Sequence, residues 1–153
     1  MTAPRVLIQG GRVLDQRGEL RADVLVDAGR IVAVEPAIDP AAVDVVLDAT
    51  GCVVSPGFVD LHAHLREPGR EEAETIETGS RAAALGGFTA VVAMPNTEPA
   101  QDSRGVVEFV RRQGDAAGLC EVLPAGCITV GRAGERLAPY AELVDAGVRI
   151  FTD

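Results

Sequence analysis

Short hydrophobic runs separated by glycine and charged residues occupy the first third of the chain. Apolar and polar residues alternate within and around these runs, which is typical of half-buried strands that pair as hairpins. The predicted strands are residues 6–8, 12–14, 23–27, 30–34, 43–47 and 52–54. This pattern predicts a small antiparallel β unit over residues 1–55, the N-terminal part of a small β domain.

From about residue 56 the pattern alternates between short apolar runs and longer amphipathic segments. The predicted strands are residues 58–61, 88–94, 121–128 and 148–151, and the predicted helices are residues 72–85, 103–117 and 139–145. Such alternation indicates parallel βαβ units, which build either a doubly wound sheet or an eight-stranded barrel. No glycine-rich phosphate loop follows the first of these strands. We therefore predict an α/β fold in which residues 56–153 are the first four βα units, the first half of a TIM barrel.

Composition agrees with a folded protein and narrows the range of partners. The chain has 153 residues, of which 47% are hydrophobic and 24% charged, and its formal net charge is −9. An acidic surface does not favour nucleic acid or anionic membranes. No apolar run approaches the roughly 20 residues that span a bilayer, and Met1–Arg5 do not open a signal peptide, so we expect a cytoplasmic protein. The 3 cysteines, none in CxxC spacing, favour neither a disulfide framework nor a thiolate zinc site.

Both histidines of the chain, His62 and His64, lie at the end of the first predicted parallel strand. Residues two apart in a strand point to the same side, so both rings can reach one metal ion at about 2.0–2.1 Å. A β/α barrel places its active site at the carboxyl ends of its strands. Two unconnected surface histidines are the alternative, which their shared position at a strand end disfavours. The spacing thus predicts a metal site in a metal-dependent barrel.

The sequence around these histidines resembles a known family. Residues 60–69, DLHAHLREPG, resemble the signature of dihydroorotases, in particular the bacterial class I branch. Further blocks similar to that family are ETGSRAAALGGFT at 77–89, VAMPNTEP at 92–99 and GVRIFTD at 147–153. The resemblance covers essentially the whole chain, as the N-terminal portion of such an enzyme. It implies the zinc-dependent, reversible cyclisation of N-carbamoyl-L-aspartate to L-dihydroorotate in de novo pyrimidine biosynthesis.

The resemblance also implies roles for individual residues. His62 and His64 would bind zinc, and Asp153 would coordinate the same ion or bridge two ions. Arg66 and Asn96, together with His64, would hold the substrate, Arg66 by a bidentate ion pair with its carboxylate. The family's general acid/base aspartate and two further histidine ligands come later in its barrel, so no catalytic residue is assigned in this chain. We therefore expect residues 1–153 alone to be inactive.

Two other functions stay open at this point. Hydantoinases and allantoinases look similar but generally bridge their metals with a carboxylated lysine, whereas all 14 basic residues here are arginine and Asp153 stands at the corresponding strand end. A non-catalytic dihydroorotase-like subunit that scaffolds aspartate transcarbamoylase is the other alternative, and the presence of His62, His64 and Asp153 argues against it.

The partners implied are aspartate transcarbamoylase and a second copy of the chain. Asp60 is a candidate to orient a ligand, and Glu67 to fix the loop after the strand.

Overall fold

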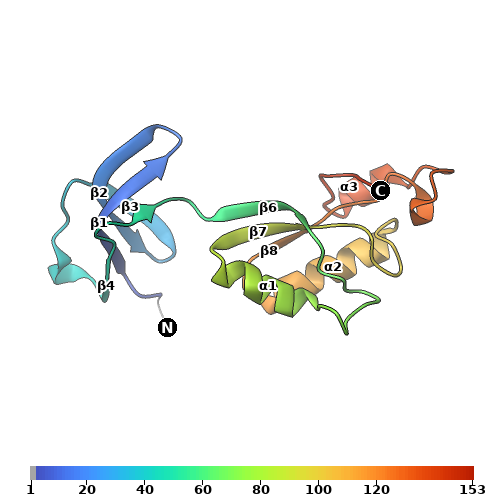
Figure 1. Cartoon of the computed structure of the whole chain (residues 1–153), viewed down its shortest axis with the longest axis horizontal. Helices are drawn as coiled ribbons and strands as arrows, with labels where there is room; N and C mark the ends of the chain where they lie inside the picture. Colours follow the sequence, from blue (N-terminus) through green and yellow to red (C-terminus); the bar gives the residue numbers. More distant parts are fainter. Residues whose placement is uncertain (1–2) are drawn as a thin grey trace. The chain divides into compact units, whose positions relative to one another are not determined.

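The structure, a computed structural model, describes residues 3–153 and divides into two compact units (Figure 1). The first unit ends at Pro56, and the second runs from Gly57 to Asp153. The first unit contains five strands and one 3-10 helix: β1 (Val6–Asp15), β2 (Gly18–Asp27), β3 (Arg30–Glu35), η1 (Pro40–Ala42), β4 (Val45–Asp48) and β5 (Val53–Val54).

The sheet of the first unit is mixed. Its order is β3-β2-β1-β4, and the short β5 also pairs with β1. β1, β2 and β3 are antiparallel neighbours, as predicted, whereas β4 and β5 run parallel to β1. The prediction of an antiparallel unit is therefore wrong for these two strands. Residues 36–44 carry the chain from the β3 edge of the sheet to the opposite edge, and such a crossover allows β4 to join in parallel.

A buried carboxylate fixes the irregular part of this sheet. Asp23 is 5% exposed and accepts hydrogen bonds from the backbone N–H of Gly10 at 2.8 Å and of Ile38 at 3.0 Å. The bond from Gly10 is the main reason why the pKa of Asp23 lies below its usual value. Gly10 lies where the β1–β2 register shifts, between Ile8 and Gly11, so the carboxylate holds the bulge.

The second unit begins with a parallel sheet in the order β6 (Phe58–Ala63), β7 (Phe88–Ala93) and β8 (Glu121–Pro124). Helices α1 (Ile76–Leu85) and α2 (Arg104–Ala117) lie on one face of this sheet (Figure 1). The 3-10 helix η2 (Val130–Arg132) and helix α3 (Tyr140–Asp145) follow. Residues 148–151, the predicted fourth strand, do not form a strand in the structure. Within the described residues they pair through one isolated parallel bridge, between Phe151 and Gly126.

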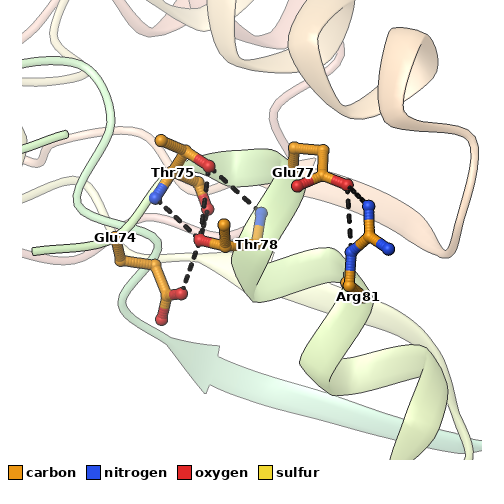
Figure 2. Close-up of polar contacts among 5 residues, drawn as sticks. All are labelled: Glu74, Thr75, Glu77, Thr78 and Arg81. Atoms are coloured by element: carbon orange, nitrogen blue, oxygen red, sulfur yellow. Dashed lines mark hydrogen bonds and ion pairs between the residues drawn. The ribbon is translucent and has the colours of Figure 1, made fainter.

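Helix α1 begins later than predicted because its start is set by a capping box and not by the acidic residues before it. The Thr75 hydroxyl accepts from the N–H of Thr78 at 3.1 Å, and the Thr78 hydroxyl accepts from the N–H of Thr75 at 3.0 Å (Figure 2). This reciprocal pair satisfies two donors that a helix start leaves unpaired. Glu77 and Arg81, one turn apart on the same helix, form an exposed ion pair (Figure 2).

Apolar residues cover both faces of the central strand β7. Toward the helices, a buried cluster comprises Leu65, Ile76, Val91, Ala93, Val110 and Val122. On the opposite face, Val92, Met94 and Ala125 form a second buried cluster. This two-sided burial explains the continuous apolar run of β7, as expected for a parallel strand. Among residues 3–153, no helix combines the length and apolar character needed to cross a membrane.

Candidate functional site

The two histidines lie next to each other at the carboxyl end of β6. Their ring centroids are 5.1 Å apart in an edge-to-face arrangement, and both side chains are exposed. The strand is irregular here, because Asp60 pairs with Val91 and Ala63 with Ala93, which leaves one extra residue in β6. The Asp60 carboxylate accepts the backbone N–H of His62 at 2.9 Å and thus supports this bulge. Asp60 therefore holds the backbone of His62, and within the described residues its carboxylate forms no hydrogen bond with the His62 ring.

The second histidine is fixed by an asparagine from the next strand end. His64 Nδ1 lies 2.9 Å from Asn96 Oδ1, in the loop after β7. Because an amide oxygen can only accept, this contact assigns the hydrogen to Nδ1 and leaves Nε2 as the nitrogen that can face a ligand. A histidine whose second ring nitrogen is held in this way has the tautomer and orientation of a metal ligand.

Arg66 has an unusual backbone for a residue with a side chain. Its φ is +64°, and the N–H of Glu67 donates to the carbonyl of Leu65 at 2.7 Å, which closes a γ-turn around Arg66. Residues without glycine's freedom adopt such conformations rarely and at an energetic cost, mostly at functional sites. Within the described part of the chain, the Arg66 guanidinium forms no hydrogen bond or ion pair. It is therefore available for an anionic ligand.

The loops that carry Arg66 and Asn96 are tied to one another. The N–H of Glu98 donates to the carbonyl of Pro68 at 2.9 Å. Gly69, with φ +105°, packs so closely that a Cβ at this position would lie 2.9 Å from the Cα of Glu98 and closer still to its carbonyl oxygen. The close approach and the positive φ both require glycine.

A buried glutamine fixes the other end of the Asn96 loop. Gln101 is fully buried, and its Nε2 donates to the carbonyl of Met94 at 2.8 Å. Its backbone N–H donates to Pro95 at 3.2 Å, and its carbonyl accepts the N–H of Cys127 at 3.0 Å. Gln101 thus links the ends of β7 and β8. Burial raises the pKa of the Cys127 thiol to about 12, so this residue is neutral at physiological pH.

Asp153 is engaged by the loop after β8. Its Oδ1 accepts the N–H groups of Ile128 at 2.9 Å and Thr129 at 3.1 Å, and its Oδ2 accepts the Thr129 hydroxyl at 2.5 Å. The hydroxyl bond from Thr129 is the main reason why the pKa of Asp153 lies below its usual value. The carboxylate is therefore ionised.

Thr129 and Gln101 were not predicted as residues of the site. Neither belongs to a recognisable motif, and both contact residues that are distant in sequence.

The predicted metal ligands are only partly assembled. Within residues 3–153, no group of three or more His, Cys, Asp or Glu side chains is arranged to hold a metal ion, so Asp153 does not join the two histidines. Both imidazoles fit a shared ion by donor type, and His64 also by its orientation against Asn96. A cleft of about 420 Å³ beside β6 and α1 is lined by both rings, and by Asp60, Glu74 and Phe88 among others.

Comparison with known proteins relates the chain and its fold to a family. The family model described as "Dihydro-orotase-like" matches residues 51–153. The dihydroorotase of Mycobacterium tuberculosis is 53% identical over 151 residues, which cover 97% of this chain and 34% of that protein. The dihydroorotase of Pelobacter propionicus is 48% identical over 151 residues, which cover 97% of this chain and 35% of that protein.

Among solved structures, an L-hydantoinase (dihydropyrimidinase) from Arthrobacter aurescens is similar, with a TM-score of 0.79 and 25% identity. The match covers 97% of this chain and 32% of that one. The fold is thus that of the hydantoinase group of amidohydrolases. The chain belongs to the dihydroorotase-like family, as the resemblance in its sequence predicted. It spans about a third of the length of the curated relatives it matches.

Proposed function

We propose that this chain is part of a dihydroorotase, which interconverts N-carbamoyl-L-aspartate and L-dihydroorotate. The observation that carries the proposal is the group at the ends of β6 and β7: the adjacent rings of His62 and His64, the Asn96 amide on His64, and the uncommitted guanidinium of Arg66. The 48–53% identity to proteins named dihydroorotase supports dihydroorotate as the substrate over other cyclic amides. In this proposal residues 56–153 are the first four βα units of a TIM barrel, and residues 1–153 alone are inactive.

For the metal, we propose zinc, as one or two ions, held by His62 and His64. When bound, zinc would polarise the carbonyl of the substrate and lower the pKa of a bound water to about 7. Asp153 is the proposed carboxylate ligand. Two observations support it: its carboxylate is ionised, and it lies two residues after Phe151, which pairs in parallel with Gly126. Both oxygens of its carboxylate already accept hydrogen bonds, from the N–H groups of Ile128 and Thr129 and from the Thr129 hydroxyl.

The chain's own residues would bind and orient the substrate. Ring closure joins the carbamoyl nitrogen of N-carbamoyl-L-aspartate to the side-chain carboxyl carbon and releases water, so the α-carboxylate stays free. This carboxylate is the handle that Arg66 would hold by a bidentate ion pair. Asn96 Oδ1 accepts from His64, which leaves the amide nitrogen of Asn96 to donate to the same carboxylate.

The competing function is a hydantoinase, since similar solved structures carry that name. Hydantoin lacks the carboxylate that Arg66 would bind. The test is turnover of dihydroorotate, hydantoin and allantoin by the zinc-loaded, full-length protein that contains this chain. We expect ring opening of dihydroorotate, with little turnover of the other two. Preference for hydantoin or allantoin would contradict the proposal. No turnover, together with no zinc retained after incubation with the metal and dialysis, would favour a non-catalytic subunit.

Replacing Arg66 with alanine tests the substrate assignment. We expect the KM for dihydroorotate to rise about 10- to 100-fold, because hydrogen bonds to charged groups contribute roughly 1.5–3 kcal/mol. Steady-state kinetics of the full-length variant measure this change. Arg70→Ala, four residues further along the same loop, is the matched control and should leave KM within about twofold, because a screened surface charge contributes roughly 0–1 kcal/mol. An unchanged KM in Arg66→Ala would show that another group binds the carboxylate.

Several further features remain proposals of the same kind. A cytoplasmic location is proposed from the sequence pattern, and association with aspartate transcarbamoylase from the resemblance in sequence. Assembly into a homo-oligomer is proposed as well. The division into a small β domain and a barrel is supported by the boundary at Pro56.

A further inference from the structure

Glu67 is the residue after Arg66, and it joins the loop after β6 to helices α1 and α2. Its Oε2 accepts the N–H of Ile76, the first residue of α1, at 2.7 Å. Its Oε1 accepts the side-chain N–H of Gln113, near the end of α2, at 3.0 Å. Both oxygens of one half-buried carboxylate are thus used to fix a single loop. A carboxylate at a helix start is also favoured by the helix dipole.

The residue before Arg66 is fixed as firmly as the residue after it. Leu65 is 6% exposed and belongs to the cluster between the sheet and the helices. It packs on Gly79 of α1 so closely that a Cβ there would lie 2.5 Å from the Leu65 side chain. The γ-turn therefore lies between two anchors, an apolar one at Leu65 and a polar one at Glu67.

These contacts account for how Arg66 keeps an unfavourable backbone. A non-glycine residue persists at φ +64° only where the surroundings determine its conformation. The Arg66 side chain contributes no hydrogen bond or ion pair to this within the described residues. The constraint therefore comes from the backbone and from its neighbours. The Arg66 carbonyl accepts the N–H of Arg70 at 3.2 Å, and the Glu67 carboxylate supplies the side-chain hydrogen bonds that fix the following residue.

We infer that Glu67, held by Gln113, is a positioning residue that fixes Arg66 for binding the substrate carboxylate. This inference rests on the proposed function. It assigns Glu67 no contact with substrate, so its loss should weaken carboxylate binding without changing the chemistry. It also gives Gln113, in α2 and 46 residues away, an indirect part in substrate affinity.

The test uses the full-length protein with Glu67→Gln, which keeps the side-chain shape but leaves one oxygen to serve two donors. We expect the KM for dihydroorotate to rise roughly 10-fold, as for partners that orient a ligand-binding side chain, with kcat within about twofold. Gln113→Leu removes the α2 contact alone and should raise KM in the same direction by a smaller factor. Glu77→Gln, the same charge change on the exposed side of α1, is the matched control and should leave both constants unchanged.

A double variant separates positioning from general damage. If Glu67 acts through Arg66, adding Glu67→Gln to Arg66→Ala should raise KM no further. The inference is overturned if KM is unchanged in Glu67→Gln, if the two effects multiply, or if kcat falls as much as kcat/KM. No turnover of dihydroorotate by the unmodified, zinc-loaded protein refutes the proposed function and this inference with it. Turnover by that protein with an unchanged KM in Glu67→Gln refutes this inference alone.

Discussion

His62→Ala in the full-length protein is expected to abolish zinc binding at this site and to lower kcat/KM for dihydroorotate by more than about 100-fold. Loss of groups that merely orient metal ligands costs about 10- to 100-fold in affinity or activity, so loss of a ligand itself should exceed that range. His62 and His64 are the histidines whose rings lie together, which leaves the described residues no substitute imidazole. Metal content after dialysis and the rate of ring opening measure the two effects.

A control for this experiment is available in the first unit. Cys52 is an exposed residue of a type that binds zinc, but it belongs to the first unit, whereas the histidines belong to the second. Cys52→Ala should keep the metal content and activity of the unmodified protein. If His62→Ala retains the full metal content, the histidine pair is not the metal site and the proposed function loses its main support.

The second large effect concerns stability. Gly69→Ala should destabilise the protein by about 3 kcal/mol or more, because it adds two separate costs. A side chain at φ +105° carries backbone strain of roughly 1–3 kcal/mol, and the new Cβ would overlap the backbone of Glu98, for which overpacking costs a similar amount. Since this contact joins the loops of Arg66 and Asn96, we also expect a higher KM for dihydroorotate. Thermal unfolding and kinetics of the full-length variant measure the two.

Gly134→Ala is the matched comparison for this variant. Gly134 lies in the same unit with φ +75°, but a Cβ there would meet nothing within 4 Å. It should therefore show only the backbone cost, with unchanged KM. Equal losses of stability in the two variants would mean that the close approach of Gly69 to Glu98 contributes nothing.

Elements with strong local signals were predictable from the sequence. Residues 103–117 and 139–145 were predicted as helices, and α2 and α3 occupy 104–117 and 140–145. Glycine at position 118, in the left-handed conformation, ends α2 as expected from its sequence. The predicted start of α1 at residue 72 is too early, because the Thr75–Thr78 capping box begins the helix at Ile76.

Features that depend on distant residues were not predictable. The parallel pairing of β4 and β5 with β1 is decided by a crossover between the two edges of a sheet, which no local pattern encodes. In the site, spacing alone indicated His62 and His64, and motif resemblance indicated Arg66 and Asn96. The supporting contacts join residues far apart, such as Gln113 to Glu67 across 46 positions. Sequence spacing carries no information about such pairs.

The turn at Arg66 also makes this position informative about other family members. Glycine would adopt φ +64° without strain, so arginine is retained here at a cost to folding of about 1 kcal/mol or more. A relative whose substrate has no acidic group gains nothing from that cost. Along such a lineage, substitution by glycine or asparagine should be favoured, and the residue found at this one position should help to sort relatives by whether their substrates are anionic.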